Sequence, residues 1–336
     1  MLTGSKFRWG GVLVVLVMLA GLIGHKLVTA LDAPLLSEPD EQLVVQLPTG
    51  SHFQGLIAQL HRLSLIERPL LWRLYGRLLR PQVRAGEYWV QPGQSLPDLV
   101  EQMGQGRVRL HPLTIVEGWT VADLRRRLAD EPKLVQLTDG WSNDEVMASV
   151  GCEGCFAEGQ FLPETYLYAR GESDLSILER AHQAKQDAVS ALWAKRMDGL
   201  PVETPDELLI LASLIEKETA LDRERATIAG VFVRRLRLGM RLQTDPTVIY
   251  GLDESYNGDL TRAHLRTDHP WNTYTRHGLP VTPIALPSRA SLHAASQPEI
   301  GEVLYFVARG DGSHVFSATL EAHNRAVNRY IRGLEQ

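Results

Sequence analysis

Two segments of the sequence combine residue types that could cleave a neutral, hydroxyl-rich polymer. The first, residues 211–220, reads LASLIEKETA, an apolar helical pattern that ends in glutamates. Burial against apolar side chains raises the pKa of a carboxyl group, and a general acid that works near neutral pH needs such a raised pKa. The second, residues 237–251, reads RLGMRLQTDPTVIYG and is dense in side chains able to bind a polar ligand. We therefore predict a carboxyl group that acts as a general acid beside a polar binding surface.

Helical spacing distinguishes the two glutamates of the first segment. Glu218 shares its face of the helix with Leu214 and Ile215, whereas Glu216 lies on a face that includes the polar Ser213. Burial should therefore raise the pKa of Glu218 more than that of Glu216. A protonated Glu218 could donate its proton to a leaving glycosidic oxygen. The alternative is a pair of surface glutamates at a helix end.

Polar and aromatic side chains near Pro and Gly are the candidates for binding a sugar polymer. Amide, hydroxyl and carboxylate groups can bond to the hydroxyl and N-acetyl groups of a sugar, and a tyrosine ring can cover its face. The candidate substrate-binding residues are Gln243, Thr244, Asp245, Asn272, Tyr274, Glu164, Tyr166 and His314. For each the alternative is structural, because Asp and Asn are common in turns and Tyr is common in cores.

Length and composition allow two globular domains beyond a targeting segment. The chain has 336 residues, of which 22% are charged and 44% hydrophobic. The formal net charge is −5, and Lys and Arg are spread along the chain. This argues against a nucleic-acid partner, because nucleic-acid binders carry a concentrated basic face. The densest basic run, Arg234, Arg235, Arg237 and Arg241, is interpreted as a solvated helix face, with a place near the substrate as the alternative.

The N-terminus has the pattern of a membrane anchor. Lys6 and Arg8 precede an uncharged run over residues 9–24, which reaches spanning length if it continues to Val28 past Lys26. Positive charge before the run predicts a cytoplasmic N-terminus and a body on the other side of the membrane. The alternative is a cleaved signal peptide that ends at residues 28–30. Both interpretations place the body of the protein outside the cytoplasm.

Three segments after the anchor share a pattern of extended residues, a Gly turn, a Ser or Thr helix cap and an amphipathic helix. They are residues 45–60, 90–103 and 115–128. The pattern resembles the LysM-type modules that bind cell-wall glycan, and a purely structural spacer is the alternative.

The rest of the sequence predicts helices separated by strand-like and irregular segments. Helical spacing occurs at 174–197, at 205–218 behind a Thr204 cap, at 225–238 and at 320–334. Strand-like runs occur at 247–250, 303–308 and 314–316, and residues 134–155 are irregular. The predicted class is α+β.

The two cysteines, Cys152 and Cys155, occur in the sequence GCEGC. Outside the cytoplasm this spacing favours a short disulfide or two free thiols. A metal site would need two further ligands, and a redox CxxC should open a helix. We expect neither.

Several motifs, in a fixed order, resemble the MltG (YceG-like) family of endolytic murein transglycosylases. They are VEGWT at 116–120, EGQFLPETY at 158–166, EKET at 216–219, RLGMRLQTDPTVIYG at 237–251, WNTYTRHGLPVTPIALP at 271–287 and YFVARGDGSHVFSATLEAHN at 305–324. The sequence departs from the family pattern at Val281 and Ser288, where Pro and Gly are common, and at Trp271, where Tyr is common. The two cysteines are also outside the pattern.

The resemblance implies an architecture. It consists of an N-terminal transmembrane helix, a small LysM-like αβ module and a larger α+β YceG-like catalytic domain. We assign the cytoplasmic tip and anchor to residues 1–30, the LysM-like module to 31–110 and the catalytic domain to 111–336. The implied location is the inner membrane, with the catalytic domain in the periplasm, beside peptidoglycan synthases (penicillin-binding proteins) as partners.

The resemblance also implies the chemistry. The family cleaves the β-1,4 bond between N-acetylmuramic acid and N-acetylglucosamine within peptidoglycan strands and leaves a 1,6-anhydromuramyl end. Its catalytic glutamate, the second of EKET, falls on Glu218, and no metal or cofactor is required. One carboxyl group suffices because the muramyl C6 hydroxyl is the nucleophile. The alternatives are a non-catalytic glycan-binding scaffold and a hydrolase that uses a second carboxylate, Asp245 or Glu164.

Overall fold

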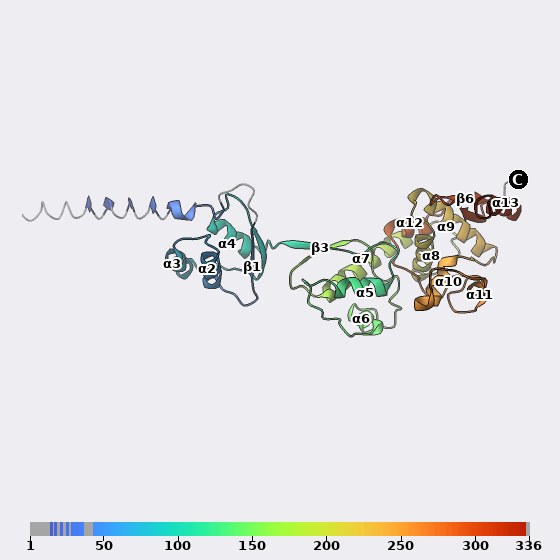
Figure 1. Cartoon of the computed structure of the whole chain (residues 1–336), viewed down its shortest axis with the longest axis horizontal. Coiled ribbons are helices and arrows are strands. Elements are labelled where there is room, and N and C mark those ends of the chain that lie inside the picture. Colours follow the sequence, from blue (N-terminus) through green and yellow to red (C-terminus); the bar gives the residue numbers. More distant parts are fainter. Residues whose placement is uncertain are drawn as a thin grey trace, which may run out of the picture. The chain divides into compact units, whose positions relative to one another are not determined.

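A computed structural model describes residues 14–15, 17–18, 21–22, 25–26, 28–36 and 43–333 (Figure 1). The chain divides into two compact units, residues 1–111 with 169–171, and residues 112–168 with 172–336. Most of the segment predicted as a membrane anchor, residues 1–30, lies outside the described residues. Among the residues that are described, we find no helix with the length and apolar character needed to span a bilayer.

Over residues 43–111 the first unit is a two-stranded sheet with three helices. Its elements are β1 (Leu43–Leu47), α2 (Phe53–Arg62), α3 (Pro69–Leu79), β2 (Gly86–Val90) and α4 (Leu96–Gly104). The strands are antiparallel, with Val45 opposite Tyr88. Both of these side chains are fully buried, and α2 and α4 add Leu56 and Leu99 to the same core. Alternate residues of β1 therefore point into a core that the helices close.

The second unit is mainly helical. Its helices are α5 (Val121–Ala129), α6 (Asn143–Ser149), α7 (Asp174–Ala194), α8 (Pro205–Glu218), α9 (Asp222–Arg237), α10 (Asp245–Leu252), the 3-10 turn η1 (Asp253–Ser255), α11 (Arg262–Arg266), α12 (Arg289–Ser296) and α13 (Leu320–Tyr330). Strand β5 (Tyr305–Ala308) pairs with β6 (His314–Ser317), and β3 (Leu110–Thr114) pairs with β4 (Thr165–Ala169); residues 110–111 and 169 of this second sheet are counted with the first unit.

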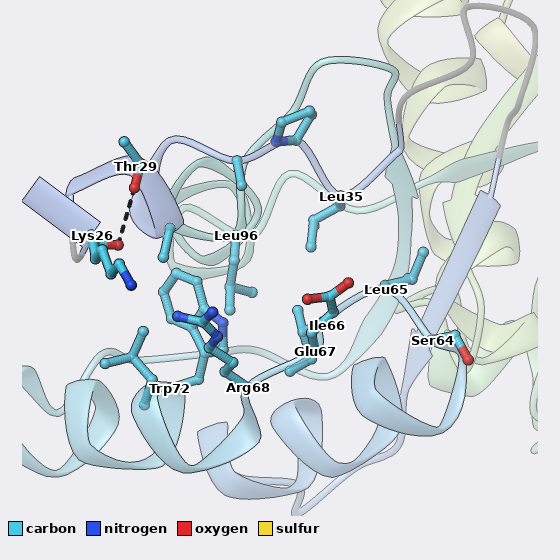
Figure 2. A pocket seen from close by; sticks show the side chains of 14 residues that line it. Lys26, Thr29, Leu35, Ser64, Leu65, Ile66, Glu67, Arg68, Trp72 and Leu96 are labelled. Carbon is cyan, nitrogen blue, oxygen red and sulfur yellow. Dashed lines mark hydrogen bonds between the residues drawn. The ribbon is translucent and has the colours of Figure 1, made fainter.

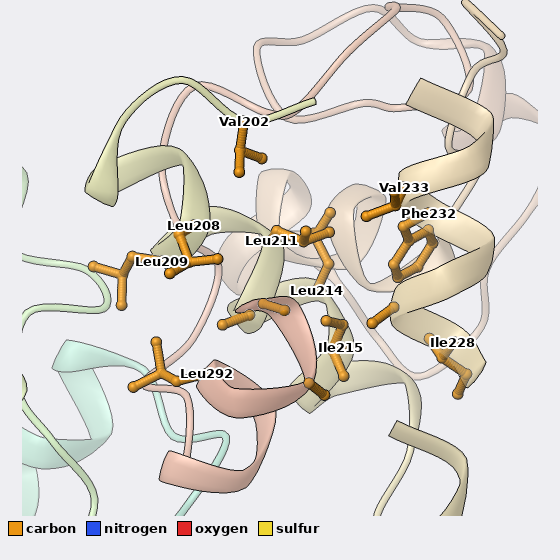
Figure 3. Packing of buried hydrophobic residues seen from close by; sticks show 14 of the residues in the cluster. Val202, Leu208, Leu209, Leu211, Leu214, Ile215, Ile228, Phe232, Val233 and Leu292 are labelled. Carbon is orange, nitrogen blue, oxygen red and sulfur yellow. The ribbon is translucent and has the colours of Figure 1, made fainter. Parts of the chain in front are cut away.

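Helix α8 is the central element of this unit. All eight residues from Leu208 to Ile215 are buried, so the helix is enclosed on every side. Figure 3 shows Leu211, Leu214 and Ile215 among side chains from α9 and α12. The helix begins as predicted, because Thr204 Oγ1 accepts a hydrogen bond from the Glu207 amide and a proline follows the cap. Burial on all sides fixes where the last turn of α8 lies.

The main error in the sequence prediction concerns residues 247–250, which were predicted as a strand and belong to helix α10. The β-branched run Thr247, Val248 and Ile249 suggested a strand. Asp245 and Pro246 occupy the first turn of α10, where an acidic side chain and a proline are both favoured. Helix α6 was also missed, although Ser142 and Glu145 form a capping box at its start. The strands predicted at 303–308 and 314–316 are confirmed as β5 and β6.

Capping residues mark two of the three repeated strand–helix segments. Ser95 caps α4 and Thr120 caps α5, each in a capping box with an aspartate three residues later. The predicted Ser or Thr cap is absent from the first segment, where His52 is the N-cap of α2 and makes no side-chain capping bond.

Removing the cap of α5 should destabilise the protein measurably. In Thr120→Ala the Asp123 amide loses its acceptor, Thr120 Oγ1, which lies 3.2 Å away. We expect the free energy of unfolding to fall by about 1 kcal/mol. Urea denaturation followed by circular dichroism would measure this. Thr120→Ser keeps the hydroxyl and should unfold close to wild type; an equal loss in both variants would contradict a capping role.

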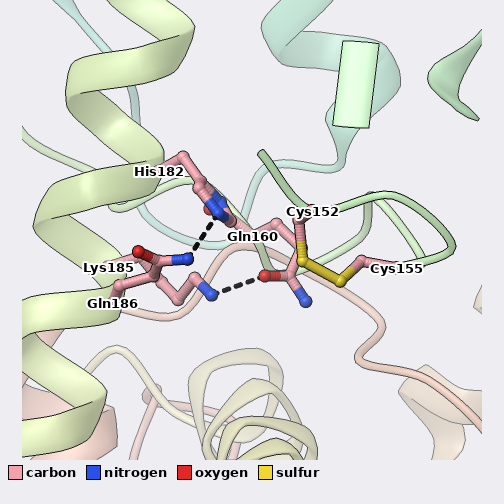
Figure 4. Close-up of a disulfide and its surroundings, with 6 residues drawn as sticks. All are labelled: Cys152, Cys155, Gln160, His182, Lys185 and Gln186. Carbon is pink, nitrogen blue, oxygen red and sulfur yellow. Dashed lines mark hydrogen bonds between the residues drawn. A yellow bond between two sulfur atoms is a disulfide. The ribbon is translucent and has the colours of Figure 1, made fainter. Parts of the chain in front are cut away.

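Cys152 and Cys155 form a disulfide, which decides between the two states that the sequence left open (Figure 4). Both cysteines pack against the buried cluster that includes Phe161 and Leu178. In the same view Lys185 of α7 points to Gln160, with Lys185 Nζ 2.5 Å from Gln160 Oε1. Burial lowers the pKa of Lys185. The disulfide closes a short turn, and this turn packs against the buried cluster to which α7 contributes Leu178.

Candidate active site

Glu218 is the last residue of α8, and the backbone turns to an extended conformation at Thr219. Glu218 is half-buried, and the desolvation of its carboxyl group raises its pKa to about 7. The direction is the one expected from its position behind the apolar face of Leu214 and Ile215. At neutral pH a substantial fraction of Glu218 therefore carries a proton that it can donate.

A hydroxyl group holds the Glu218 carboxyl in place. Thr244 Oγ1 donates a hydrogen bond to Glu218 Oε1, which moderates the rise in the pKa of Glu218. Thr244 is itself buried, and its amide donates to Thr273 Oγ1 at 3.1 Å. Thr247 Oγ1 in turn lies 2.9 Å from Thr273 Oγ1. Hydrogen bonds among Thr244, Thr247 and Thr273 thus hold the Thr244 hydroxyl that orients the Glu218 carboxyl group.

Gln243 has a left-handed backbone, with φ of 52°. Such a conformation is uncommon for residues other than Gly and clusters at functional sites. It directs the chain from the end of α9 to Thr244 and then into α10. The Gln243 amide donates to Thr273 O at 3.2 Å, and its side chain is exposed. An exposed polar side chain next to Thr244 is placed to meet a ligand.

Asp245 and Tyr274 form a polar pair beside Glu218. Tyr274 Oη donates to Asp245 Oδ1 at 2.5 Å. The negative charge of Asp245 contributes to the raised pKa of Glu218, so the two carboxyl groups are close enough to interact. The pKa of Tyr274 is raised mainly by burial and also by Asp245 and Glu218, so its hydroxyl stays protonated. The pair offers a carboxylate and an aromatic ring near the acid.

Two positively charged or chargeable side chains approach Glu218 from other elements. His314 at the start of β6 and Arg235 of α9 both lower the pKa of Glu218 by their charge. His314 Nδ1 lies 2.7 Å from Glu224 Oε2, and Arg235 Nη1 donates to Leu242 O at 2.7 Å. Arg235 is buried, so the interpretation of the whole basic run as a solvated face is wrong for this residue.

Glu158 is a second buried carboxyl group in this unit. Its oxygens accept bonds from the Val121 amide at 3.1 Å and from Tyr250 Oη at 3.2 Å. Burial outweighs these bonds and raises its pKa to about 7. Because Val121 begins α5 and Tyr250 belongs to α10, Glu158 joins two helices, and every contact it makes is internal. Glu158 thus shares the raised pKa of Glu218 but has a structural role.

Comparison with known proteins shows the family. The family description "YceG-like family" matches residues 45–329. The chain belongs to the YceG-like family. This confirms the resemblance that the sequence motifs suggested.

Named and solved relatives of the YceG-like chain agree with this placement. A Bacillus subtilis protein named endolytic murein transglycosylase is 28% identical over 312 residues, covering 85% of this chain and 84% of that protein. A Streptococcus pneumoniae protein of the same name is 26% identical over 356 residues; the match covers 95% of this chain and 64% of that protein's length. A crystal structure of a yceG-like protein from Listeria monocytogenes is 30% identical, with a TM-score of 0.52 over 85% of this chain and 99% of that one. The mixed α+β fold is therefore the YceG-like fold.

The YceG-like motifs meet around the end of α8. The Gly118 amide of VEGWT donates to Leu286 O at 2.9 Å, and Lys217 Nζ donates to Gly118 O at 3.2 Å. Ser213 Oγ of α8 accepts from the Ile284 amide at 3.1 Å. Segments more than 60 residues apart in the sequence therefore enclose the helix that carries Glu218.

The structure brings five of the nine predicted site residues into contact or electrostatic range of one another. They are Glu218, Thr244, Asp245, Tyr274 and His314. Gln243 is adjacent in sequence, whereas no interaction connects Glu164 or Tyr166 with Glu218. Glu164 is exposed and pairs with Arg289 at 2.5 Å, and Tyr166 is buried with its hydroxyl on Leu162 O.

Asn272 has a structural position rather than a ligand-facing one. Its side chain is fully buried. Nδ2 donates to Thr267 O at 2.7 Å, and Oδ1 accepts from the Tyr274 amide at 2.8 Å. Both ends of the amide are therefore used to shape the loop that carries Tyr274.

Sequence reasoning missed Glu158 and Glu224, and it gave Arg235 a place near the substrate only as the alternative. Glu158 opens the motif EGQFLPETY, so its membership of a motif was the available signal. Glu224 lies in the charged run DRER and Arg235 in RRLR, where a buried charge looks like its solvated neighbours. Among the described residues, no group of three or more His, Cys, Asp or Glu side chains is arranged to hold a metal ion.

The hydrogen bond from Thr244 predicts a shift in pH dependence. In Thr244→Val the carboxylate of Glu218 loses a donor, so the pKa of Glu218 should rise further. A net hydrogen-bond contribution of about 1 kcal/mol corresponds to a little under one pH unit. We expect the alkaline limb of the kcat/KM profile to move upward by this amount. Thr244→Ser keeps the donor and should leave the limb unchanged; a downward shift in the valine variant would contradict the assignment.

Proposed function

We propose that this protein is an endolytic murein transglycosylase, an enzyme that cleaves within the glycan strands of peptidoglycan. The observation that carries the proposal is the Glu218 carboxyl, half-buried at the end of α8, held by Thr244 and with a pKa of about 7. Membership of the YceG-like family and the names of the two relatives give the substrate class. A purely glycan-binding scaffold would have no need of a protonated carboxyl at this place.

The proposed reaction uses one carboxyl group twice. Glu218 donates its proton to the glycosidic oxygen as the bond from muramyl C1 to that oxygen breaks. The resulting carboxylate then takes the proton of the muramyl C6 hydroxyl while O6 bonds to C1. The products are a new N-acetylglucosamine hydroxyl and a 1,6-anhydromuramyl end, so no water is consumed and Glu218 is protonated again. A pKa near 7 suits a group that must both give and accept a proton.

The groups around Glu218 suggest how the substrate is held. The exposed side chains of Gln243 and Asp245 flank the acid and can bond to hydroxyl and N-acetyl groups. The Tyr274 ring, positioned by its bond to Asp245, can cover a sugar face. His314, held by Glu224, supplies a further polar edge. These four residues form the proposed binding surface.

We further propose that the chain is anchored in the inner membrane by residues 1–30, with residues 111–336 acting in the periplasm. The positively charged start and the uncharged run over residues 9–24 support the anchor. The disulfide supports an oxidising compartment. On this proposal the first unit, as a LysM-like module, binds glycan, and peptidoglycan synthases act beside the enzyme.

The products of the reaction test the proposal. The full chain in detergent is incubated with uncrosslinked glycan strands, and the products are identified by mass spectrometry. We expect 1,6-anhydromuramyl ends at internal cleavage positions. Reducing ends would instead indicate hydrolysis with Asp245 as the second carboxylate, which its electrostatic proximity to Glu218 makes the leading alternative. Binding without any cleavage would indicate a scaffold.

A further inference from the structure

Helix α3 exposes a stripe of leucines. Leu70, Leu74 and Leu78, spaced four residues apart, lie on one face of the helix and are 76%, 53% and 73% exposed. Scattered exposed apolar residues are ordinary, but a continuous stripe on one helix marks an interaction surface. The stripe therefore needs an occupant.

Packing of the opposite face prevents α3 from turning this stripe inward. Trp72 is buried and its ring contacts Tyr75 edge to face, with ring centroids 5.6 Å apart. Gly76 lies so close to Phe53 of α2 that an added Cβ would be 2.2 Å from the ring. The leucine stripe is thus held outward by a close helix–helix contact that a rotation of α3 would break.

A row of arginines borders the leucine stripe. Arg73 and Arg77 are exposed on the adjoining face, and Arg80, the exposed C-cap residue, follows the helix; among the described residues none of the three has an acidic partner. Residues 62–84 contain six arginines and one acidic residue, Glu67. A leucine face beside an arginine face is the pattern of a helix that lies in the plane of an anionic bilayer surface.

The start of α3 also adjoins the end of the N-terminal segment. A cavity of about 570 Å³ is lined on one side by Lys26 and Thr29 and on the other by Arg68 and Trp72 (Figure 2). The sequence before Lys26 is the uncharged run over residues 9–24. If that run enters a bilayer, the bilayer surface lies beside Lys26 and so beside α3.

We propose that α3 is an interfacial membrane-binding helix. Leu70, Leu74 and Leu78 insert among the acyl chains of an anionic phospholipid bilayer, and Arg73, Arg77 and Arg80 bind the lipid phosphates. The occupant is a lipid surface, because the surface combines a narrow apolar stripe with unpaired positive charge. This inference goes beyond the proposed activity and requires only that the N-terminal run enters a membrane.

Spin-label accessibility in the full chain tests the proposal. Leu74→Cys is labelled, since the two native cysteines are paired, and the protein is reconstituted in vesicles of phosphatidylcholine with or without phosphatidylglycerol. With phosphatidylglycerol we expect the label to be accessible to oxygen and shielded from a water-soluble nickel chelate. A label at Gln46→Cys is the matched control, because Gln46 is exposed on the strand β1 and should stay in water in both vesicles.

The arginine contribution is tested in the same assay. Each basic side chain near an anionic surface is worth about fivefold in partitioning, so Arg73→Gln/Arg77→Gln/Arg80→Gln should weaken docking by roughly a hundredfold. We expect the label at position 74 to return to water in this variant. Two results would overturn the proposal. The label could stay accessible to the water-soluble chelate although the arginines are present, or it could be shielded from both reagents in both kinds of vesicle, which would indicate a protein partner. Equal docking to both vesicles would overturn the role of lipid charge.

Discussion

Glu218→Gln should lose cleavage while keeping the fold. Glutamine occupies nearly the same volume and can still accept the hydrogen bond from Thr244, but it has no proton to give to a glycosidic oxygen. Loss of a general acid typically costs about 10²–10⁴-fold in rate, and here the same group is also the proposed base. We expect kcat to fall by at least this factor with little change in glycan binding. Single-turnover cleavage with mass-spectrometric detection would measure it.

Glu158→Gln is the matched control for this experiment. Both carboxyl groups are desolvated and both have a pKa of about 7, but the bonds of Glu158 run to groups inside the protein, Val121 and Tyr250 among them. We expect Glu158→Gln to retain the reaction. If the two variants lost activity to the same extent, Glu218 would have no special chemical role and the assignment would fail.

Stability against pH separates loss of chemistry from loss of structure. The folded-state pKa of Glu158 is about 7, above its ordinary value, so unfolding releases a proton between roughly pH 4.5 and 7. The free energy of unfolding is therefore highest below this pH range and falls as the pH rises through it. Glu218, whose pKa is also raised, changes the free energy of unfolding in the same direction. Either glutamine variant should therefore lose less stability than wild type between pH 5 and pH 8. An inactive Glu218→Gln protein that is also stable at pH 8 cannot owe its inactivity to unfolding.

The sequence was sufficient for features that depend on local patterns. Helix α8, its Thr204 cap and the raised pKa of Glu218 follow from the spacing of apolar residues around one carboxyl group. The strands β5 and β6 follow from two short runs of β-favouring residues separated by Gly310 and Gly312. The order of the YceG-like motifs led to the family, although no single motif would have been enough.

Features that depend on contacts between distant segments could not be predicted. Asn272 was predicted to bind substrate because nothing local shows that Nδ2 faces three backbone carbonyls, two of them in helix α11 and one at Thr267. Glu158 contacts residues 37 and 92 positions away, so its burial has no local signature. Helix α10 was predicted as a strand because β-branched residues favour strands; its first-turn Asp245 and Pro246 and its packing in the folded unit outweigh that preference.

The second large effect is expected at Glu216, the other glutamate of EKET. Its Oε2 accepts from the Ser288 amide at 2.9 Å and from Ser288 Oγ at 2.5 Å, at the start of α12. Its Oε1 lies 3.6 Å from Arg225 Nη2 of α9, and the two side chains are only 5% and 6% exposed. Glu216 thus joins three helices. Arg225 also pairs with the exposed Asp222, so in Glu216→Gln its charge loses only the buried partner, and we expect the free energy of unfolding to fall by about 1–3 kcal/mol.

Replacing both members of the pair shows whether the loss comes from the buried Arg225 charge that no longer faces Glu216. Arg225→Met fills a similar space without charge, and buried ion pairs replaced by apolar groups often lose little stability. We therefore expect Glu216→Gln/Arg225→Met to be clearly more stable than Glu216→Gln alone, as judged by urea denaturation of the four proteins of the cycle. Losses that simply add would mean that the two side chains stabilise the helices independently. A recovery in the double variant would instead assign Glu216 to the support of α8, which leaves Glu218 as the carboxyl group of EKET available for chemistry.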